Sequence, residues 1–227
     1  MASAAVSPAD ALAGGGSLDD LRLALAPAVA QAAVFDGWTE AAVLAAAEAE
    51  GVEPAVARLA FGDGQMAMIE AFVAATDAAM RAHFADGRLG NMKIRDRIGA
   101  LVRFRLEYAA GLEEALSRAL AIQAMPSNAG RALKLGWSSA DAMWRLAGDT
   151  ATDYNHYTKR AILASIYAAT LAVFIDDDSE GKAETHAFLD RRIDGVMKFE
   201  KAKAQFTSKR EHFDLVRFLG RLRYPQR

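Results

Sequence analysis

Residues 143–161 read MWRLAGDTATDYNHYTKRA, and they lead directly into an apolar stretch, AILASIYAATLAVFI, over residues 161–175. The first stretch gathers aromatic, acidic and basic side chains. The second is interrupted only by Ser165, Tyr167 and Thr170. An apolar run of this length without strict alternation is typical of a buried helix. Polar groups so dense, leading into a run so apolar, predict the mouth of a buried cavity.

Helix signals also dominate the rest of the chain, and no segment alternates apolar and polar residues as a half-buried strand does. Glycine and proline mark the breaks between the expected helices. The sequence therefore predicts an all-α fold with helices over residues 18–35, 40–50, 54–61, 65–84, 91–124, 128–135, 138–147, 154–176, 182–203 and 205–224.

The order of these helices resembles that of a TetR-type repressor, in which three short helices precede a larger helical unit. We therefore expect a TetR-family-like helical bundle with an N-terminal helix-turn-helix-like unit at residues 17–64 and a larger helical domain at residues 65–203. A basic amphipathic C-terminal helix is expected at residues 204–227, and residues 1–16, rich in Ala, Gly and Ser, are expected to be disordered.

Composition narrows the class of protein. The chain has 227 residues and no cysteine, which excludes disulfides and thiolate metal sites and favours a reducing compartment. The apolar run at residues 161–175 is shorter than the roughly 20 residues of a membrane span. Residues 1–16 lack the basic start of a secretory signal and the arginines of a mitochondrial presequence. These observations favour a bacterial-type cytoplasmic protein.

The charge distribution argues against DNA binding by the N-terminal unit. Residues 1–70 carry ten acidic and two basic residues, a net charge of −8, and the expected recognition helix at residues 54–61 offers only Arg58 as a base. Proteins grip DNA by neutralising its phosphates, so this unit would be repelled. A ligand-responsive transcription regulator is the alternative that the fold alone suggests, but fold does not give function.

Residues 143–175 admit three interpretations. In the first, Asp149 and Asp153 are turn and cap residues, and Lys159 and Arg160 point to solvent. In the second, His156 works with nearby carboxylates in catalysis or metal binding. The chain contains neither the Glu-x-x-His pairs of a di-iron bundle nor an HExxH zinc motif, so we predict no catalytic residue, no metal ligand and no enzyme.

The third interpretation is an apolar pocket with the guanidinium of Arg160 at its edge, since arginine pairs with phosphate or carbonyl oxygens while its stem lies on apolar surface. Apolar and aromatic side chains of the following helix would line it. The residues alone leave a filled core and a cavity equally open. The lining would be formed by Ile162, Leu163, Ile166, Tyr167, Leu171 and Phe174.

The pattern WxxAGDxxTDYNxYTKRA over residues 144–161 resembles the signature of the Coq nine family of ubiquinone-biosynthesis accessory proteins. The segments FLDRRI at residues 188–193 and GWTEAA at residues 37–42 are similar to the family's closing helix and to its N-terminal helix-turn-helix. The resemblance is strongest over about residues 125–203 and extends over most of the chain.

This resemblance implies a TetR-like fold that has lost DNA binding and carries isoprenoid lipid or phospholipid as its ligand, with no cofactor. It implies presentation of quinone precursors to a ring hydroxylase of the di-iron demethoxyubiquinone type, and a homodimer. The implied lipid contacts are Arg160, Trp144, Tyr157, Leu163, Ile166, Tyr167, Leu171 and Phe174. The implied partner-docking patch comprises Met143, His156 and Tyr157.

The chain departs from the family pattern at two positions, where His156 and His186 replace tryptophan. Histidine buries less apolar area than tryptophan, which is a strong interface anchor. The resemblance therefore implies lipid binding more strongly than docking to the usual hydroxylase.

The C-terminal segment predicts contact with a membrane surface. From Lys198 onward the chain carries nine basic and three acidic residues, and aromatic residues recur every seven positions. A helix with an apolar stripe and a basic face can lie on an anionic bilayer, although such a helix can also pack on its own domain. We expect a protein peripheral to a bacterial inner membrane, with membrane contacts from Phe206, Phe213, Val216, Arg217 and Arg221.

Overall fold

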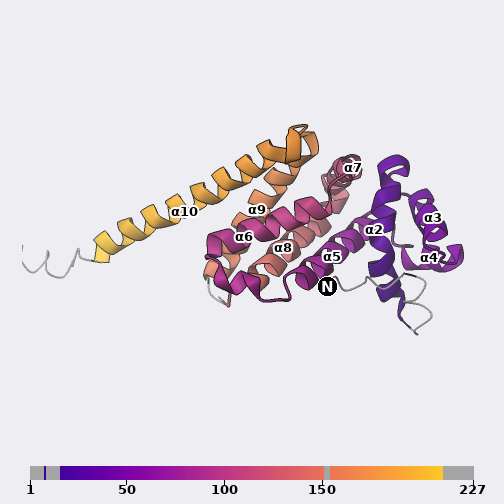
Figure 1. Ribbon diagram of the computed structural model, residues 1–227, viewed down its shortest axis with the longest axis horizontal. Coiled ribbons are helices and arrows are strands. Elements are labelled where there is room, and N and C mark those ends of the chain that lie inside the picture. Colours follow the sequence, from indigo (N-terminus) through magenta and orange to yellow (C-terminus); the bar gives the residue numbers. More distant parts are fainter. Residues whose placement is uncertain (1–7, 9–15, 151–153, 212–227) are drawn as a thin grey trace, which may run out of the picture.

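The computed structural model describes residue 8, residues 16–150 and residues 154–211, with side chains described for residues 16–150 and 156–198. Within these ranges the secondary structure is helical and contains no strand, which confirms the predicted all-α, TetR-like fold class (Figure 1). The helices are α2 (Leu18–Asp36), α3 (Glu40–Ala49), α4 (Pro54–Ala60), α5 (Gln65–His83), α6 (Ile94–Tyr108), α7 (Glu113–Gln123), α8 (Ala129–Leu146), α9 (Tyr154–Asp176) and α10 (Ala183–Glu211).

Helices α2 to α4 form the compact N-terminal unit that the sequence predicted (Figure 1). A capping box between Ser17 and Asp20 begins α2, and Gly37 ends it with a φ of 68° that favours glycine. The unit is fixed to the bundle by Trp38, which is fully buried and donates from Nε1 to the carbonyl oxygen of Ala115 in α7 at 2.8 Å.

The expected recognition helix α4 carries one basic side chain, and it is engaged within the unit. Arg58 pairs through Nε with the carboxylate of Glu40 in α3 at 2.6 Å. Arg22 of α2, the other basic residue of the described unit, pairs with Asp19 at 2.9 Å and donates to the carbonyl oxygen of Ala60 at 2.5 Å. Both guanidinium groups are thus engaged within the unit. The absence of nucleic-acid binding stays a prediction, and these contacts support it.

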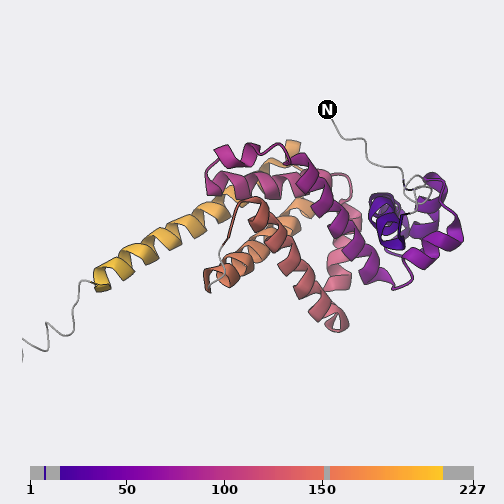
Figure 2. The ribbon, with the colours of Figure 1, turned by 90° about the horizontal axis from the view of Figure 1, so that it is seen from below.

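Helices α5 to α9 form the larger bundle, and α10 packs along it before running beyond its far end, away from α2 to α4 (Figures 1 and 2). The buried face of α10 carries Leu189 and Ile193, with Val196 packed against the same core. Two ion pairs fasten α10 to α6: Arg95 with Asp194 at 2.7 Å and Arg103 with Asp190 at 2.5 Å.

Two helix boundaries differ from those predicted. The single helix expected over residues 91–124 is two, α6 and α7, because the chain turns at residues 109–112, where Gly111 adopts a φ of 84°. The break expected between residues 135 and 138 does not exist, since α8 runs unbroken through Gly136. Ser138 does not cap a new helix; its hydroxyl donates back to the carbonyl oxygen of Leu135 at 3.0 Å.

The C-terminal part also differs. The helices expected over residues 182–203 and from residue 205 are one continuous helix, α10, as far as Glu211. Residues 212–227 lie outside the described residues, as do most of residues 1–16, so the disorder expected at the N-terminus is untested. The predicted domain boundaries likewise stay predictions.

The connection between α9 and α10 is held by the buried carboxylate of Asp177. One carboxylate oxygen accepts from the hydroxyl and the backbone N–H of Ser179 at 2.5 and 2.9 Å, and the other accepts from the hydroxyl and the N–H of Thr185 at 2.6 and 2.8 Å. These donors hold the pKa of Asp177 well below its ordinary value of 3.8. The carboxylate therefore fixes the direction in which α10 leaves α9.

Because the pKa of Asp177 is depressed on folding, its ionised form stabilises the fold above 3.8, and this contribution is lost as the pH falls below that value. We expect Asp177→Asn to unfold at a lower temperature at neutral pH, and to lose less of its remaining stability on acidification than the unsubstituted protein. Thermal unfolding followed by circular dichroism from about pH 6 to about pH 2.5 measures both effects. The exposed neighbour Asp178→Asn is the control, and identical acid sensitivity of the two variants would contradict the assignment.

Candidate functional site

The signature motif lies where α8 ends and α9 begins, and its charged side chains form one ion-pair cluster. The carboxylate of Asp149 accepts from Nζ of Lys159 at 2.7 Å and from Nη1 of Arg160 at 3.0 Å. Burial alone would raise the pKa of Asp149, but the two cations outweigh it and lower the pKa below its ordinary value. Asp149, which the first interpretation took for a turn residue, is thus a buried anion between the two cations that the same interpretation pointed to solvent.

Arg160 is committed to this cluster. Its side chain is 2% exposed, and Nε contacts the carboxylate of Asp141 in α8 at 2.5 Å, while Nη1 also donates to the carbonyl oxygen of His156 at 3.1 Å. The second oxygen of Asp141 pairs with Arg145 at 2.7 Å. The guanidinium therefore ties α9 to α8 from the inside, whereas the sequence placed it at the edge of a cavity.

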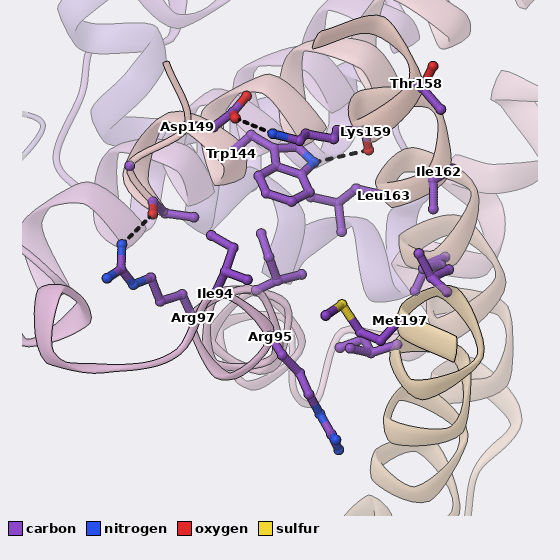
Figure 3. Close-up of a pocket in the computed structure, with 16 residues that line it drawn as sticks. Ile94, Arg95, Arg97, Trp144, Asp149, Thr158, Lys159, Ile162, Leu163 and Met197 are labelled. Carbon is purple, nitrogen blue, oxygen red and sulfur yellow. Dashed lines mark hydrogen bonds and ion pairs between the residues drawn. The ribbon is translucent and has the colours of Figure 1, made fainter. Parts of the chain in front are cut away.

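A cavity of about 410 Å³ lies beside the cluster, between α6, α8, α9 and α10 (Figure 3). Its wall is mainly apolar, and charged side chains occur on the sides formed by α6 and the start of α9. The volume is within the range of about 300–1,000 Å³ common to small-molecule sites. The lining residues are Ile94, Arg95, Arg97, Ile98, Trp144, Ala147, Gly148, Asp149, Thr158, Lys159, Ile162, Leu163, Ile166, Ile193, Val196 and Met197.

The indole of Trp144 and the ammonium of Lys159 form one corner of this cavity (Figure 3). The indole Nε1 donates to the carbonyl oxygen of Lys159 at 3.0 Å, and the Lys159 ammonium lies 5.3 Å from the ring centroid. On the α6 side, Arg95 extends outward, where it pairs with Asp194 of α10 (Figure 3). Lys159 and Arg95 are the cationic side chains at the cavity that keep substantial solvent exposure.

Arg97 shapes the same corner from α6. Its guanidinium donates to three backbone carbonyl oxygens, those of Met92 and Gly90 at 2.9 Å each and that of Ala147 at 2.7 Å. Gly148 follows with a φ of 88°, and a Cβ there would lie 3.2 Å from Arg97 Nη1. The glycine of the motif is thus required both by the backbone turn and by the approach of Arg97.

The structure divides the predicted lipid contacts between two cavities. Trp144, Ile162, Leu163 and Ile166 line the large cavity, and their contact with lipid stays a prediction. Tyr167 and Leu171 line a second cavity of about 110 Å³ deeper in the bundle. The apolar helix therefore contributes to two separate spaces along its length.

The other three predicted lipid contacts line neither cavity. Phe174 is buried in the core beneath the ammonium of Lys182, 4.7 Å from its ring centroid. Tyr157 is 62% exposed on the outer surface, and Arg160 is enclosed in its ion pairs. Their contact with lipid stays a prediction.

The predicted docking patch is partly wrong. Met143 is fully buried in the core, because α8 turns this residue inward, so it is not available on the surface. His156 and Tyr157 do lie together, with ring centroids 5.1 Å apart. Trp137 of α8 joins them at 6.3 and 5.9 Å. Sequence reasoning missed Trp137, although its spacing of four from Leu133, which is exposed, marks a shared helix face.

The predicted membrane contacts cannot be placed. Phe206 falls within α10, but its side chain lies outside the described residues. Phe213, Val216, Arg217 and Arg221 lie outside the described residues altogether. Their membrane contact stays a prediction.

Two of the four helices around the large cavity, α6 and α10, were not assigned to the site by sequence reasoning. Ile94 and Ile98 of α6 form one wall, and Ile193, Val196 and Met197 of α10 form another. Apolar residues recur at three- and four-residue spacing in both helices, as at Ile94 and Ile98 and at Ile193 and Val196, and this spacing was the available signal. It could not show that the two faces enclose a space rather than meet.

Among the described residues, one segment, His156–Asp176 within α9, is long and apolar enough to cross a membrane by length and composition. In the structure it packs against α8 and α10 and buries Leu163, Ile166 and Phe174 in the core. About 28% of the apolar part of the segment is buried, so most of it stays at least partly exposed among the described residues.

The fold and the site together define an all-α protein of TetR-like architecture with an apolar cavity beside a buried ion-pair cluster. The family model described as COQ9 matches residues 129–200, which cover α8, α9 and most of α10. The matched range contains the ion-pair cluster and two walls of the large cavity.

Relatives extend the similarity. The chain is 34% identical over 172 residues to "Ubiquinone biosynthesis protein COQ9, mitochondrial" of Rattus norvegicus, covering 71% of this chain and 54% of the relative. It is 32% identical to the Homo sapiens protein of that name, covering 71% and 52%, and 29% identical to that of Drosophila melanogaster, covering 83% and 59%. The chain thus spans about half the length of the curated relatives it matches. The resemblance to the Coq nine family is confirmed, and the chain belongs to the COQ9 family.

The same relatives correct the predicted location. The expectation of a bacterial cytoplasmic protein, peripheral to the inner membrane, is wrong, because the relatives are mitochondrial proteins of eukaryotes. The expectation relied on the absence of arginines from residues 1–16, and that short stretch was not a sufficient basis for it.

Proposed function

We propose that this chain is a non-enzymatic, lipid-binding accessory protein of ubiquinone biosynthesis that presents isoprenoid quinone intermediates to a ring hydroxylase. The names of the COQ9 relatives indicate the pathway. Lipid binding and presentation are the further steps of the proposal. They concern the whole protein, of which the matched region is about half in those relatives.

The observation that carries the proposal is the 410 Å³ cavity with apolar walls from four helices. A prenyl chain is a row of branched hydrocarbon units, and burying it contributes about 0.8 kcal/mol for each CH₂ removed from water. Leu163, Ile166 and Ile193 offer the branched surface that such a chain would contact. A carrier also needs a polar end, where the head of the lipid can stay near water.

Lys159 and Arg95 provide that polar end. Both line the cavity and keep solvent exposure, and each carries a cation that can pair with a phosphate or a carbonyl oxygen. In this proposal Arg160 does not contact the lipid and acts through Asp149. It neutralises Asp149, which in turn holds Lys159 over Trp144 at the cavity corner.

The patch formed by Trp137, His156 and Tyr157 is the proposed contact for a hydroxylase of the di-iron demethoxyubiquinone type. Aromatic side chains are favoured anchors in protein interfaces, and Tyr157 is largely exposed. The homodimer implied by the resemblance is a further part of the proposal, and analytical ultracentrifugation of the purified chain tests it.

Lipid extraction tests the central proposal. The full chain is purified without detergent, extracted with organic solvent and examined by lipid mass spectrometry. We expect an isoprenoid quinone, quinone precursor or phospholipid in a stoichiometric amount, because an exposed apolar cavity of this size favours occupancy. Protein that carries no such lipid, and takes up none from mixed vesicles, would count against lipid binding.

The basic C-terminal segment is the proposed membrane contact. Truncation after Gln205 is expected to abolish co-sedimentation with vesicles rich in anionic lipid, since each basic residue near such a surface contributes about 1 kcal/mol. The measurement is the bound fraction at low and high salt. Unchanged co-sedimentation of the truncated chain would place the membrane contact elsewhere.

A further inference from the structure

The part of α10 that borders the large cavity has two sections, one before and one after Gly195. Ile193 lies before the glycine, and Val196 and Met197 lie after it. Burial decreases along these residues: Ile193 is 6% exposed, Val196 is half-buried and Met197 is 44% exposed. The helix then runs on beyond the end of the bundle (Figure 1). The glycine therefore lies where α10 changes from a packed helix to a projecting one.

The section before Gly195 is held firmly against α6. The two ion pairs between these helices, at Asp190 and Asp194, both lie in it. Ile193 also lies close to Gly99 of α6, since a Cβ on that glycine would be 3.8 Å from the isoleucine Cδ1. Ion pairs and close packing thus fix α10 to α6 as far as Asp194.

The section after Gly195 lacks such contacts. Within residues 196–198, the last ones whose side chains are described, no side chain forms an ion pair or a hydrogen bond with the bundle. Met197 extends from α10 toward α6 (Figure 3). Ile94, on the α6 side of the same cavity, is 40% exposed. The mouth of the cavity is therefore bordered by the part of α10 that only apolar contacts hold in place.

Gly195 weakens the helix at this point, although packing does not require a glycine there. Glycine in a helix interior is less stable than alanine, because it loses more conformational freedom on folding. A Cβ at Gly195 would meet no atom within 4 Å, whereas a Cβ at Gly99 would lie 3.0 Å from Arg103 Nη1. The close approach of neighbouring groups explains the glycine of α6, and it does not explain the glycine of α10. Free space and low helix propensity together make Gly195 a position at which α10 can bend.

We propose that α10 is a gate of the large cavity, which opens when the helix bends at Gly195 and moves Val196 and Met197 away from α6. The section up to Asp194 is the fixed side of this hinge. Opening widens the gap between Ile94 and Met197, through which a branched chain must pass. The gate rests on the proposed function for what enters the cavity, but access to the cavity can be measured without a lipid.

A single thiol inside the cavity measures the opening, because the chain has no cysteine of its own. Leu163→Cys places this thiol on the α9 wall, at a position that is 2% exposed, where N-ethylmaleimide reaches it when the mouth opens. Met143→Cys, at a fully buried position that does not line the cavity, is the matched control for general unfolding. The measurement is the labelling rate of each full-length variant, freed of bound lipid by detergent exchange, by mass spectrometry of the intact protein.

Two substitutions at the hinge are expected to change the labelling of the cavity thiol in opposite directions. Gly195→Ala favours the straight helix and should slow labelling about fivefold, whereas Gly195→Pro bends the helix and should speed it at least about tenfold. Gly136→Ala, at an interior glycine of α8 where a Cβ also meets no atom within 4 Å, should change the rate less than about twofold. The core thiol of Met143→Cys should stay unreactive throughout.

Several results would overturn the gate. They are an unchanged rate at the cavity thiol in Gly195→Ala, an equal change at the core thiol, and labelling of the cavity as fast as that of an exposed thiol before any change at Gly195. Gly195→Ala alone decides the matter if Gly195→Pro does not fold. The expected labelling in a chain that carries no lipid would support the gate and contradict the proposed function, so the two can fail separately.

Discussion

Replacing Arg160 with methionine is expected to lower the free energy of unfolding by about 3–5 kcal/mol, the cost of breaking a buried ion pair from one side. The side chain is 2% exposed and pairs with both Asp141 and Asp149, so its removal takes the buried cation from two poorly solvated carboxylates and leaves each with one more exposed partner, Arg145 or Lys159. Urea unfolding followed by circular dichroism measures the loss. We expect reduced lipid content as a consequence, because the junction between α8 and α9 loosens.

Arg145→Met is the matched control. Arg145 pairs with the same carboxylate of Asp141 at 2.7 Å, but its side chain is 74% exposed. Solvent screens such a pair, so its loss is expected to cost at most about 1 kcal/mol. If Arg160→Met kept its stability and lost only lipid, the guanidinium would be a ligand-binding group, as the sequence first indicated. Equal destabilisation by the two variants would contradict the special role of the buried pair.

The different position of Arg160 shows what the local pattern could and could not predict. The motif gathered acids and bases in one short segment, and the structure does join Asp149, Lys159 and Arg160. The further partner, Asp141, lies in α8, and a predicted break in that helix obscured its position. The sequence suggested that Arg160 binds a lipid headgroup at the edge of a cavity. In the structure its guanidinium instead joins α8 to α9 in the interior.

The helix boundaries show the same limit of local sequence patterns. Some boundaries are marked by a capping residue where the helix begins or by a glycine with positive φ where it ends, as Ser17 and Gly37 mark α2. The sequence predicts these boundaries correctly. The local sequence does not show which of Gly111 and Gly136 interrupts a helix. The first takes a φ of 84° and separates α6 from α7, whereas the second stays helical and borders a cavity. Tertiary packing decides between these outcomes, so propensity alone could not predict them.

The cavity is likewise a tertiary property. The α9 part of its wall, including Leu163 and Ile166, was predicted from one apolar helix. The parts from α6 and α10 required knowing that the faces around Ile98 and Val196 stand apart instead of interlocking. Sequence periodicity reports which side of a helix is apolar, and it carries no information on the distance to the opposite wall.

The sharpest test of the large cavity is to fill it. Val196→Trp places an indole on the α10 wall, where Val196 is half-buried and borders the cavity of about 410 Å³. Excluding only two CH₂ groups of a bound lipid costs about 1.6 kcal/mol at about 0.8 kcal/mol each, so we expect a more than tenfold loss of lipid affinity. The measurement is the amount of lipid per protein after detergent-free purification, by quantitative mass spectrometry.

Arg191→Trp controls for adding an indole to α10, because Arg191 is exposed and does not line the cavity. The helix content of both variants, measured by circular dichroism, should match the unsubstituted chain, since the cavity offers the new ring space that a filled core would deny. Equal lipid content in the two tryptophan variants would show that the lipid is carried outside this cavity, and the proposed carrier mechanism would then fail.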